Sequence, residues 1–241
     1  MAEGIALLPL TGIGEIKPGA DLARVIADAL TPANPDGSDL RQGDVVVITQ
    51  KVVSKAEGRI VPIDPDDPAA KSALVEQESV RVLRRRGDLI ISETRHGFIC
   101  ANAGIDLSNV ELGTAALLPV DSDRSARRIR TRLGVLLGIE VGVIISDTFG
   151  RTWRRGVTDV AIGCAGVAAV IDLRGTLDAN GRELIATEIC VADELASAAE
   201  LVMGKDRGIP AAIVRGVPHE WLRSASVRTE IVRPPEEDLF R

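Results

Sequence analysis

Aromatic side chains are scarce in this sequence of 241 residues, which contains three phenylalanines, two tryptophans and no tyrosine. Proteins that bind nucleic acids usually combine a basic surface with aromatic residues that stack on bases. This chain offers neither over its whole length, because its formal net charge at pH 7 is −6. We therefore expect no nucleic-acid partner.

Histidine and cysteine are also rare. His96 and His219 are the only histidines, and the three cysteines lie far apart with no CxxC spacing. A histidine-rich zinc site is therefore not expected, and the apolar neighbours of Cys100, Cys164 and Cys190 predict buried thiols. A metal bound by this chain would be a hard ion held by oxygen atoms, such as Mg²⁺ or Mn²⁺.

Long hydrophobic runs are absent as well. No segment approaches the roughly 18 consecutive apolar residues of a membrane span, and the opening MAEGIALLPL lacks the basic residues of a signal peptide. We expect no membrane association and a cytoplasmic location. The hydrophobic content of 45% is instead typical of a soluble globular protein with a sizeable core.

Apolar residues follow helical and strand periodicity in turn, which predicts an α/β fold of the α+β type. We expect one domain over residues 1–241, as a single unit or as two interleaved lobes. Predicted helices cover residues 21–30, 66–88, 123–138 and 191–205, and predicted strands cover residues 44–49, 88–93, 97–102, 140–147 and 209–216. Residues 31–39 are expected to form a loop and residues 217–241 an irregular tail.

Two segments offer carboxylates to a metal ion. The run IISDT places Asp147 and Thr148 at the C-terminal end of a predicted strand, where nucleotide-using enzymes often hold Mg²⁺. Alternatively, Asp147 caps a turn. The segment NAGIDLSNV adds Asp106 and, three residues later, Asn109, whose side chains share one face if the segment turns helically. A turn stabilised by Asp106 itself is the alternative there.

Lysine and serine residues follow the predicted strand 44–49. Lys51, Ser54 and Lys55 suit phosphate oxygens, and a solvated turn explains them equally well. The P-loop pattern GxxxxGK[ST] occurs nowhere in the sequence. GIGEIKPG misses the dinucleotide pattern GxGxxG because Lys17 stands at the last glycine. We therefore expect neither a P-loop nor a Rossmann site.

Three arginines crowd the segment just beyond Asp147. Arg151, Arg154 and Arg155 alternate with Trp153 in GRTWRRG. Guanidinium groups bind carboxylates and phosphates through two parallel hydrogen bonds, so these residues are candidates for holding an anionic substrate close to the metal. The alternative is a solvent-facing turn with a stacked Trp153.

Five segments together resemble the coenzyme F420-0:γ-glutamyl ligase family. They are GDVVVITQKVVSKAEGR, NAGIDLSNV, SDTFGRTWRRGVTDVAIGCAG, DANGRELIATEICVADELASAAELVMGK and IPAAIVRG, in the family's order and near its spacing. The resemblance implies an amide ligase that uses GTP to add L-glutamate to F420-0 and then further glutamates through γ-links. It also implies the F420-0:γ-glutamyl ligase-like fold, an intertwined homodimer, two divalent ions (Mg²⁺ or Mn²⁺) and a requirement for K⁺.

The resemblance also assigns roles to residues. Asp106 and Asp147 would bind one metal ion and Thr148 the second. The two aspartates and, from their place beyond Asp147, the three arginines are the expected catalytic residues. Contacts to GTP would come from Ile13, Gly14, Glu15, Ile16, Gln50, Lys55, Asn109 and Gly204.

The chain departs from the family pattern in three places. Gln50 and Lys51 stand where archaeal members have a Ser-Thr pair. The loop MGKDRGIP is one residue shorter than the archaeal glycine-rich loop, which leaves the remaining ligand of the second metal unassigned, with Glu188 and Glu194 as candidates by charge. Actinobacterial relatives often continue after DLF into a flavin-binding, reductase-like domain, which we do not expect here.

Overall fold

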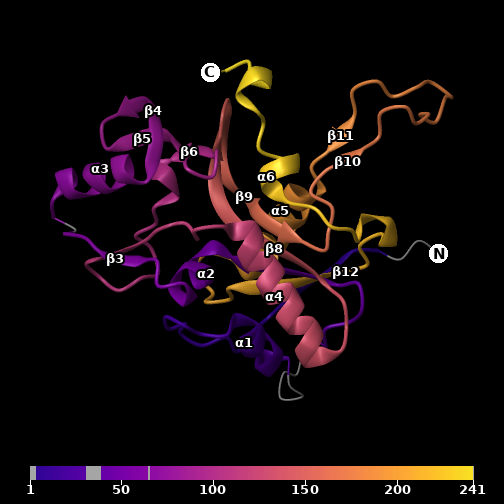
Figure 1. Ribbon diagram of the computed structural model, residues 1–241, viewed down its shortest axis with the longest axis horizontal. Helices are drawn as coiled ribbons and strands as arrows, with labels where there is room; N and C mark the ends of the chain where they lie inside the picture. Colours follow the sequence, from indigo (N-terminus) through magenta and orange to yellow (C-terminus); the bar gives the residue numbers. More distant parts are fainter. Residues whose placement is uncertain (1–3, 31–38, 65, 241) are drawn as a thin grey trace.

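The computed structural model describes residues 4–30, 39–64 and 66–240 of the chain. Its centre is a five-stranded sheet in the order β1-β12-β2-β8-β9 (Figure 1). Only β2 and β8 run parallel, and Thr49 at the end of β2 is the register partner of Ser146 on β8. The residues that follow these two positions therefore meet at one edge of the sheet. The strands are β1 (Ala6–Pro9), β12 (Ala211–Arg215), β2 (Val45–Thr49), β8 (Gly142–Arg151) and β9 (Arg154–Ala165).

Helices cover both faces of this sheet, which is why its strands are apolar on both sides. Val46 and Ile48 of β2 pack with α1 (Leu22–Ala29), α2 (Gln50–Ala56) and α4 (Ser122–Leu137). Val45 and Val47, which point the other way, pack with α5 (Val191–Met203). This alternation is the two-residue period of a strand buried on both faces. The layered arrangement is an α/β architecture, as the sequence predicts.

Residues 60–64 and 66–117 form a smaller unit, the small lobe, beside the central sheet (Figure 1). It contains its own core, built from Val75, Ile90, Ala103, Ile105, Ala115 and Leu117. Its elements are β3 (Ile60–Pro62), α3 (Pro68–Gln77), β4 (Ser79–Arg86), β5 (Leu89–Thr94), β6 (Ile99–Ala101), the 3-10 turn η1 (Asn102–Gly104) and β7 (Thr114–Ala116). The small lobe places the residues after η1 opposite the edge of the central sheet.

Two hairpins extend the fold. The β8–β9 hairpin turns at Thr152 and Trp153, and β10 (Ile171–Asp172) pairs with β11 (Glu188–Ile189) at the base of a long arm that projects from the body (Figure 1). The C-terminal segment carries the short elements η2 (His219–Trp221), α6 (Val227–Glu230) and η3 (Pro235–Glu237). No helix among the described residues is long and apolar enough to cross a membrane.

The predicted helix over residues 66–88 is wrong in its second half. The helix α3 ends at Gln77, and Ser79–Arg86 form β4, which pairs antiparallel with β5. Gly87, with φ of +56°, turns the chain between the two strands. The arginines at residues 84–86 resemble a helix C-terminus by charge, whereas the alternating Val80, Val82 and the neighbouring β5 favour a strand.

The other long predictions are confirmed. The predicted helices 21–30, 123–138 and 191–205 correspond to α1, α4 and α5, and Gly138 ends α4 in the left-handed conformation. The predicted strands 44–49, 140–147 and 209–216 correspond to β2, β8 and β12, and those at 88–93 and 97–102 to β5 and β6. The predicted loop at 31–39 falls almost entirely outside the described residues. Cys100 and Cys164 are buried and Cys190 is partly buried.

Candidate functional site

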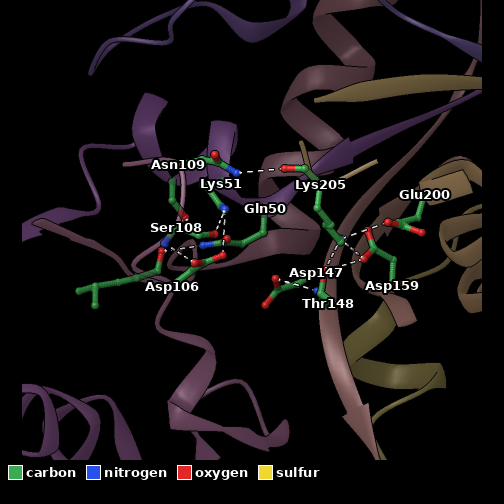
Figure 2. Close-up of polar contacts among 12 residues, drawn as sticks. Gln50, Lys51, Asp106, Ser108, Asn109, Asp147, Thr148, Asp159, Glu200 and Lys205 are labelled. Carbon is green, nitrogen blue, oxygen red and sulfur yellow. Dashed lines mark hydrogen bonds and ion pairs between the residues drawn. The ribbon is translucent and has the colours of Figure 1, made fainter. Parts of the chain in front are cut away.

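Asp147 and Asp106 reach the same space from two sides, one from the central sheet and one from the small lobe (Figure 2). Asp147 lies on β8, just past the point where β8 pairs with the end of β2. A β-bulge in the β8–β9 ladder between Ile145 and Ser146 immediately precedes it. Bulges of this kind re-aim the side chains that follow and are common beside functional sites.

A strained turn presents Asp106. Asn102, Ala103 and Gly104 all have positive φ, of 50°, 53° and 71°, and a side chain on Gly104 would approach Leu118 to within 2.8 Å. Positive φ is costly for Asn and especially for Ala, so surrounding contacts must hold the turn. One such contact is the Asn102 side-chain oxygen, which accepts from the Ile90 N–H at 3.0 Å. The backbone of Asp106 then pairs with Ala116 in both directions.

The carboxylate of Asp106 is neutralised by a lysine. Its Oδ2 lies 2.9 Å from the Lys51 ammonium, and its Oδ1 accepts from the Ser108 N–H at 2.6 Å. Lys51 also donates to the Ser108 hydroxyl at 2.9 Å. Burial opposes ionisation, and the hydrogen bonds from Lys51 and Ser108 outweigh it, so the pKa of Asp106 lies below its usual value. Asp106 is therefore an anion at neutral pH.

Asp147 has the opposite electrostatic environment. Burial, together with the negative charges of Asp106 and Asp159, raises its pKa from 3.8 to about 7, and a hydrogen bond from the Thr148 N–H opposes this rise. Lys205 is near enough to lower the pKa, but no cationic side chain makes an ion pair with Asp147 among the described residues. Asp147 thus lies among carboxylates and lacks a direct counter-ion.

Asp159, a buried carboxylate of β9 that lies next to Thr148, is not among the residues predicted from the sequence. It is 1% exposed, and its oxygens accept from the hydroxyls of Ser146 at 3.1 Å and Thr148 at 2.7 Å. The ammonium of Lys205 lies 2.7 Å from Oδ1. The available signal was an acid between the apolar residues of VTDVAIG, since an acid in a buried strand is rare unless it is paired.

The loop after α5 brings Lys205 to this carboxylate. Lys205 donates to the Thr148 hydroxyl as well as to Asp159, and it lies 3.8 Å from a carboxylate oxygen of Glu200 (Figure 2). Glu188 and Glu194, the candidate ligands by charge, are elsewhere. Glu188 lies in the arm and pairs with Arg174 at 3.2 Å, and Glu194 is exposed in the first turn of α5.

The predicted nucleotide contacts lie in two groups. Lys55, in the last turn of α2, pairs with Glu15 at 2.5 Å, which brings the turn Ile13, Gly14, Glu15 and Ile16 to the C-terminal end of α2. The Asn109 amide donates to the Lys205 carbonyl at 3.4 Å, which brings Asn109 beside Gly204. Gly204 has φ of +64°, a conformation that favours glycine. These residues come from separate elements, and their contacts to GTP stay a prediction.

Gln50 does not fit the predicted role. Its side chain is 1% exposed, and its amide nitrogen donates to the Ser54 hydroxyl at 2.8 Å and to the Leu117 carbonyl at 3.0 Å. Both amide hydrogens therefore have partners within the protein. In this arrangement the side chain of Gln50 joins α2 to the small lobe and leaves neither amide hydrogen for a nucleotide.

The three arginines lie at the tip of the β8–β9 hairpin. All are exposed, and none forms an ion pair with an acidic side chain in the described parts of the chain. The guanidinium of Arg151 donates to the Arg155 carbonyl at 3.2 Å. Trp153 is 86% exposed, so it does not stack on a neighbour as the alternative interpretation supposes.

The donor set fits one hard ion. Asp106 and Asp147 supply oxygens from two sides. Asp147 has no direct counter-ion although other carboxylates surround it, so a cation there would be stabilised. No group of three or more His, Cys, Asp or Glu side chains that could hold a metal by themselves occurs within residues 4–30, 39–64 and 66–240. Substrate oxygens or water would have to complete the coordination. The second metal position, expected at Thr148, differs from the first because the Lys205 ammonium already contacts the Thr148 hydroxyl.

Together, an α/β body carries a cluster of carboxylates beside lysine and amide side chains, the groups with which proteins bind divalent cations and phosphates. Residues 12–216 match the family model described as F420-0:Gamma-glutamyl ligase. The chain belongs to this family. It is 45% identical to the coenzyme F420:L-glutamate ligase of Methanothermobacter thermautotrophicus over 99% of each chain. It is also 44% identical to that of Methanopyrus kandleri over 94% of each, and 40% identical to that of Archaeoglobus fulgidus over 98% and 96%.

Proposed function

We propose that this chain uses GTP to join L-glutamate to coenzyme F420-0, and then adds glutamate through γ-links. The observation that carries the proposal is the family match over residues 12–216, which includes both Asp106 and Asp147. The near full-length similarity to ligases of named activity supports the same reaction. The carboxylate pair supports phosphate chemistry that needs a divalent cation.

The reaction needs an activated carboxylate, because a free carboxylate has no acceptable leaving group at neutral pH. We infer that the γ-phosphoryl group of GTP passes to a terminal carboxylate oxygen of F420-0, which gives an acyl phosphate and GDP. The glutamate amine then forms the C–N bond, inorganic phosphate leaves with the C–O electron pair, and the amine loses a proton. Water must be kept from the acyl phosphate, since hydrolysis would waste the nucleotide.

Residues of this chain would divide the task. Asp106 and Asp147 would hold Mg²⁺ or Mn²⁺, which when bound supplies positive charge to phosphate oxygens. Lys55, Asn109 and the backbone at Gly204 would position the nucleotide. The exposed guanidinium groups of the β8–β9 hairpin would bind carboxylates or the phosphodiester of F420-0. A K⁺ requirement and a cytoplasmic location belong to the same proposal.

We also propose a homodimer in which the arm of one protomer packs against its partner. The arm between β10 and β11 exposes Leu177 at 68% and Ile185 at 82%, and it projects from the body (Figure 1). Apolar side chains on a projecting hairpin cost free energy in water unless a second surface covers them. Sedimentation equilibrium would test this, and a protein that stays monomeric at high micromolar concentration would contradict it.

The decisive experiment incubates the purified protein with F420-0, GTP, glutamate and Mn²⁺ and analyses the products by mass spectrometry. We expect F420 species that carry one or more added glutamyl residues, with GDP and phosphate released in equal amounts. GTP turnover that is independent of glutamate would indicate a different phosphotransferase. Binding of F420-0 without any GTP turnover would indicate a non-catalytic deazaflavin-binding domain.

A further inference from the structure

The ammonium of Lys205 is surrounded by side-chain oxygen atoms. It contacts the Thr148 hydroxyl, lies 2.7 Å from Asp159 and lies 3.8 Å from Glu200. The Thr148 hydroxyl donates its only hydrogen to Asp159 over 2.7 Å. Its oxygen can therefore only accept a further hydrogen bond or bind a cation. Lys205 is that cation. The surrounding oxygens are those that a second metal ion bound at Thr148 would need.

The charges around the aspartates give a second argument. Four negative charges are present when the carboxylates of Asp106, Asp147, Asp159 and Glu200 are ionised. The ammonium groups of Lys51 and Lys205 contribute two positive charges. The remaining two negative charges match one divalent cation. A second divalent ion beside Thr148 would lie against the Lys205 ammonium, and like charges at such short range repel strongly.

The loop that carries Lys205 also holds it in place. Lys205 lies in MGKDRGIP, directly after α5. Its backbone is held from the other side by Asn109, which donates to the Lys205 carbonyl. The side chain therefore extends from an anchored point toward Asp159 (Figure 2).

We propose that the Lys205 ammonium replaces the second metal ion in this protein, so that its site binds a single divalent cation between Asp106 and Asp147. The inference rests on the proposed function, because it concerns the ions that the ligase reaction uses. A tethered ammonium at Thr148 supplies one positive charge at a fixed place and does not leave with the products.

The test counts Mn²⁺ ions and locates them. Equilibrium dialysis with Mn²⁺ and a non-hydrolysable GTP analogue, followed by anomalous diffraction from crystals grown with both, is applied to the wild type and to Lys205→Gln. A matched control is Lys71→Met, which removes a lysine of α3 outside the candidate site. Thermal unfolding checks that each variant is folded, which is expected because the Lys205 side chain is 53% exposed.

We expect about one Mn²⁺ per chain in the wild type and in Lys71→Met, at Asp106 and Asp147, and about two in Lys205→Gln, the second beside Thr148. Two ions in the wild type, or one ion still in Lys205→Gln, would overturn the proposal. The ligation assay is run in parallel and is independent of the count. A protein that binds one ion but forms no glutamylated product would refute the proposed function and leave the cation assignment standing.

Discussion

Thr148 and Asp159 are cross-strand partners whose side chains are hydrogen bonded. They are paired in the β8–β9 register, and the Thr148 hydroxyl donates to the Asp159 carboxylate over 2.7 Å. Asp159 also accepts from Ser146 and pairs with Lys205, so one buried carboxylate joins two strands and a distant loop. Removal of Asp159 therefore takes the acceptor from the hydroxyls of Ser146 and Thr148 and a counter-ion from Lys205 at once.

We expect Asp159→Ala to lower the free energy of unfolding by about 1–3 kcal/mol, the cost of leaving buried polar groups without partners. Ligation should also fall, because Lys205 and Thr148 lose their common anchor. Urea unfolding and steady-state kinetics measure the two effects. Asp28→Ala, at an exposed position of α1, is the control and should change stability by less than about 0.5 kcal/mol. Equal stability of Asp159→Ala and the wild type would show that the network is not structural.

Much of the fold could be predicted from local pattern. The apolar run of β8 that leads to Asp147 and the helices α4 and α5 have clear apolar patterns, which tertiary contacts reinforce. The β4 strand could not be predicted in the same way. Its arginines resemble a helix end, and only pairing with β5 decides its conformation.

The candidate site was predictable only in part. Asp106 and Asp147 are visible because each follows a recognisable strand or turn. Lys205 is not, because its proximity to Asp159 depends on how a loop after α5 returns to β9 across 46 residues of sequence. Gln50 shows the opposite error, since its place in the chain suggests a ligand contact and only the packing of Leu117 reveals that it is buried.

Asp147→Asn should stabilise the metal-free protein at alkaline pH. A pKa of about 7 in the folded state, against 3.8 ordinarily, means that the native carboxyl keeps a proton which the unfolded chain has lost. The contribution of this carboxyl to the free energy of unfolding is fully present below pH 3.8 and is lost as the pH rises through about 7. The loss is on the order of 4 kcal/mol. Urea unfolding in EDTA should therefore favour the variant more at pH 8 than at pH 5. An equal difference at both pH values would contradict the pKa, and we expect the variant to lack ligase activity.

Binding of Mn²⁺ should depend on pH for the same reason. An ion held between Asp106 and Asp147 must displace the proton of Asp147, so affinity should fall about tenfold for each pH unit below about 7 and level off above it. Calorimetry in buffers of different ionisation enthalpy would measure both the affinity and the released proton. Asp147→Asn should bind more weakly and show no such slope. A wild-type affinity that does not change between pH 5 and 7 would place the ion elsewhere.

The three cysteines should be inert in the native protein. Burial raises the pKa of each thiol, Cys100, Cys164 and Cys190, to about 12. Since the thiolate is the reactive species, we expect slow reaction with a disulfide reagent at pH 8 and rapid reaction of all three thiols in denaturant. Rapid modification of a native thiol together with unchanged unfolding would show that it is accessible.

The arginines at the tip of the β8–β9 hairpin should matter for kinetics and not for stability. Arg151, Arg154 and Arg155 are exposed and have no acidic partner in the described chain, so each Arg→Ala change should alter stability by less than about 0.5 kcal/mol. The proposed substrates F420-0, GTP and glutamate would together bring more negative charge than the site neutralises, so at least one guanidinium should bind substrate oxygens. Its loss should cost on the order of 1.5–3 kcal/mol in kcat/KM, a factor of about 10 to 150.

Arg→Lys at the same position separates charge from geometry. An ammonium keeps the positive charge but cannot form the two parallel hydrogen bonds of a guanidinium, so it should recover only part of the loss. Arg→Ala and Arg→Lys at each of the three positions give six variants to compare by steady-state kinetics, with F420-0 and glutamate varied separately to identify the ligand. Arg24, exposed on α1, supplies the control Arg24→Ala, which should keep wild-type constants. If all six variants also keep them, the hairpin arginines serve only as solvated surface.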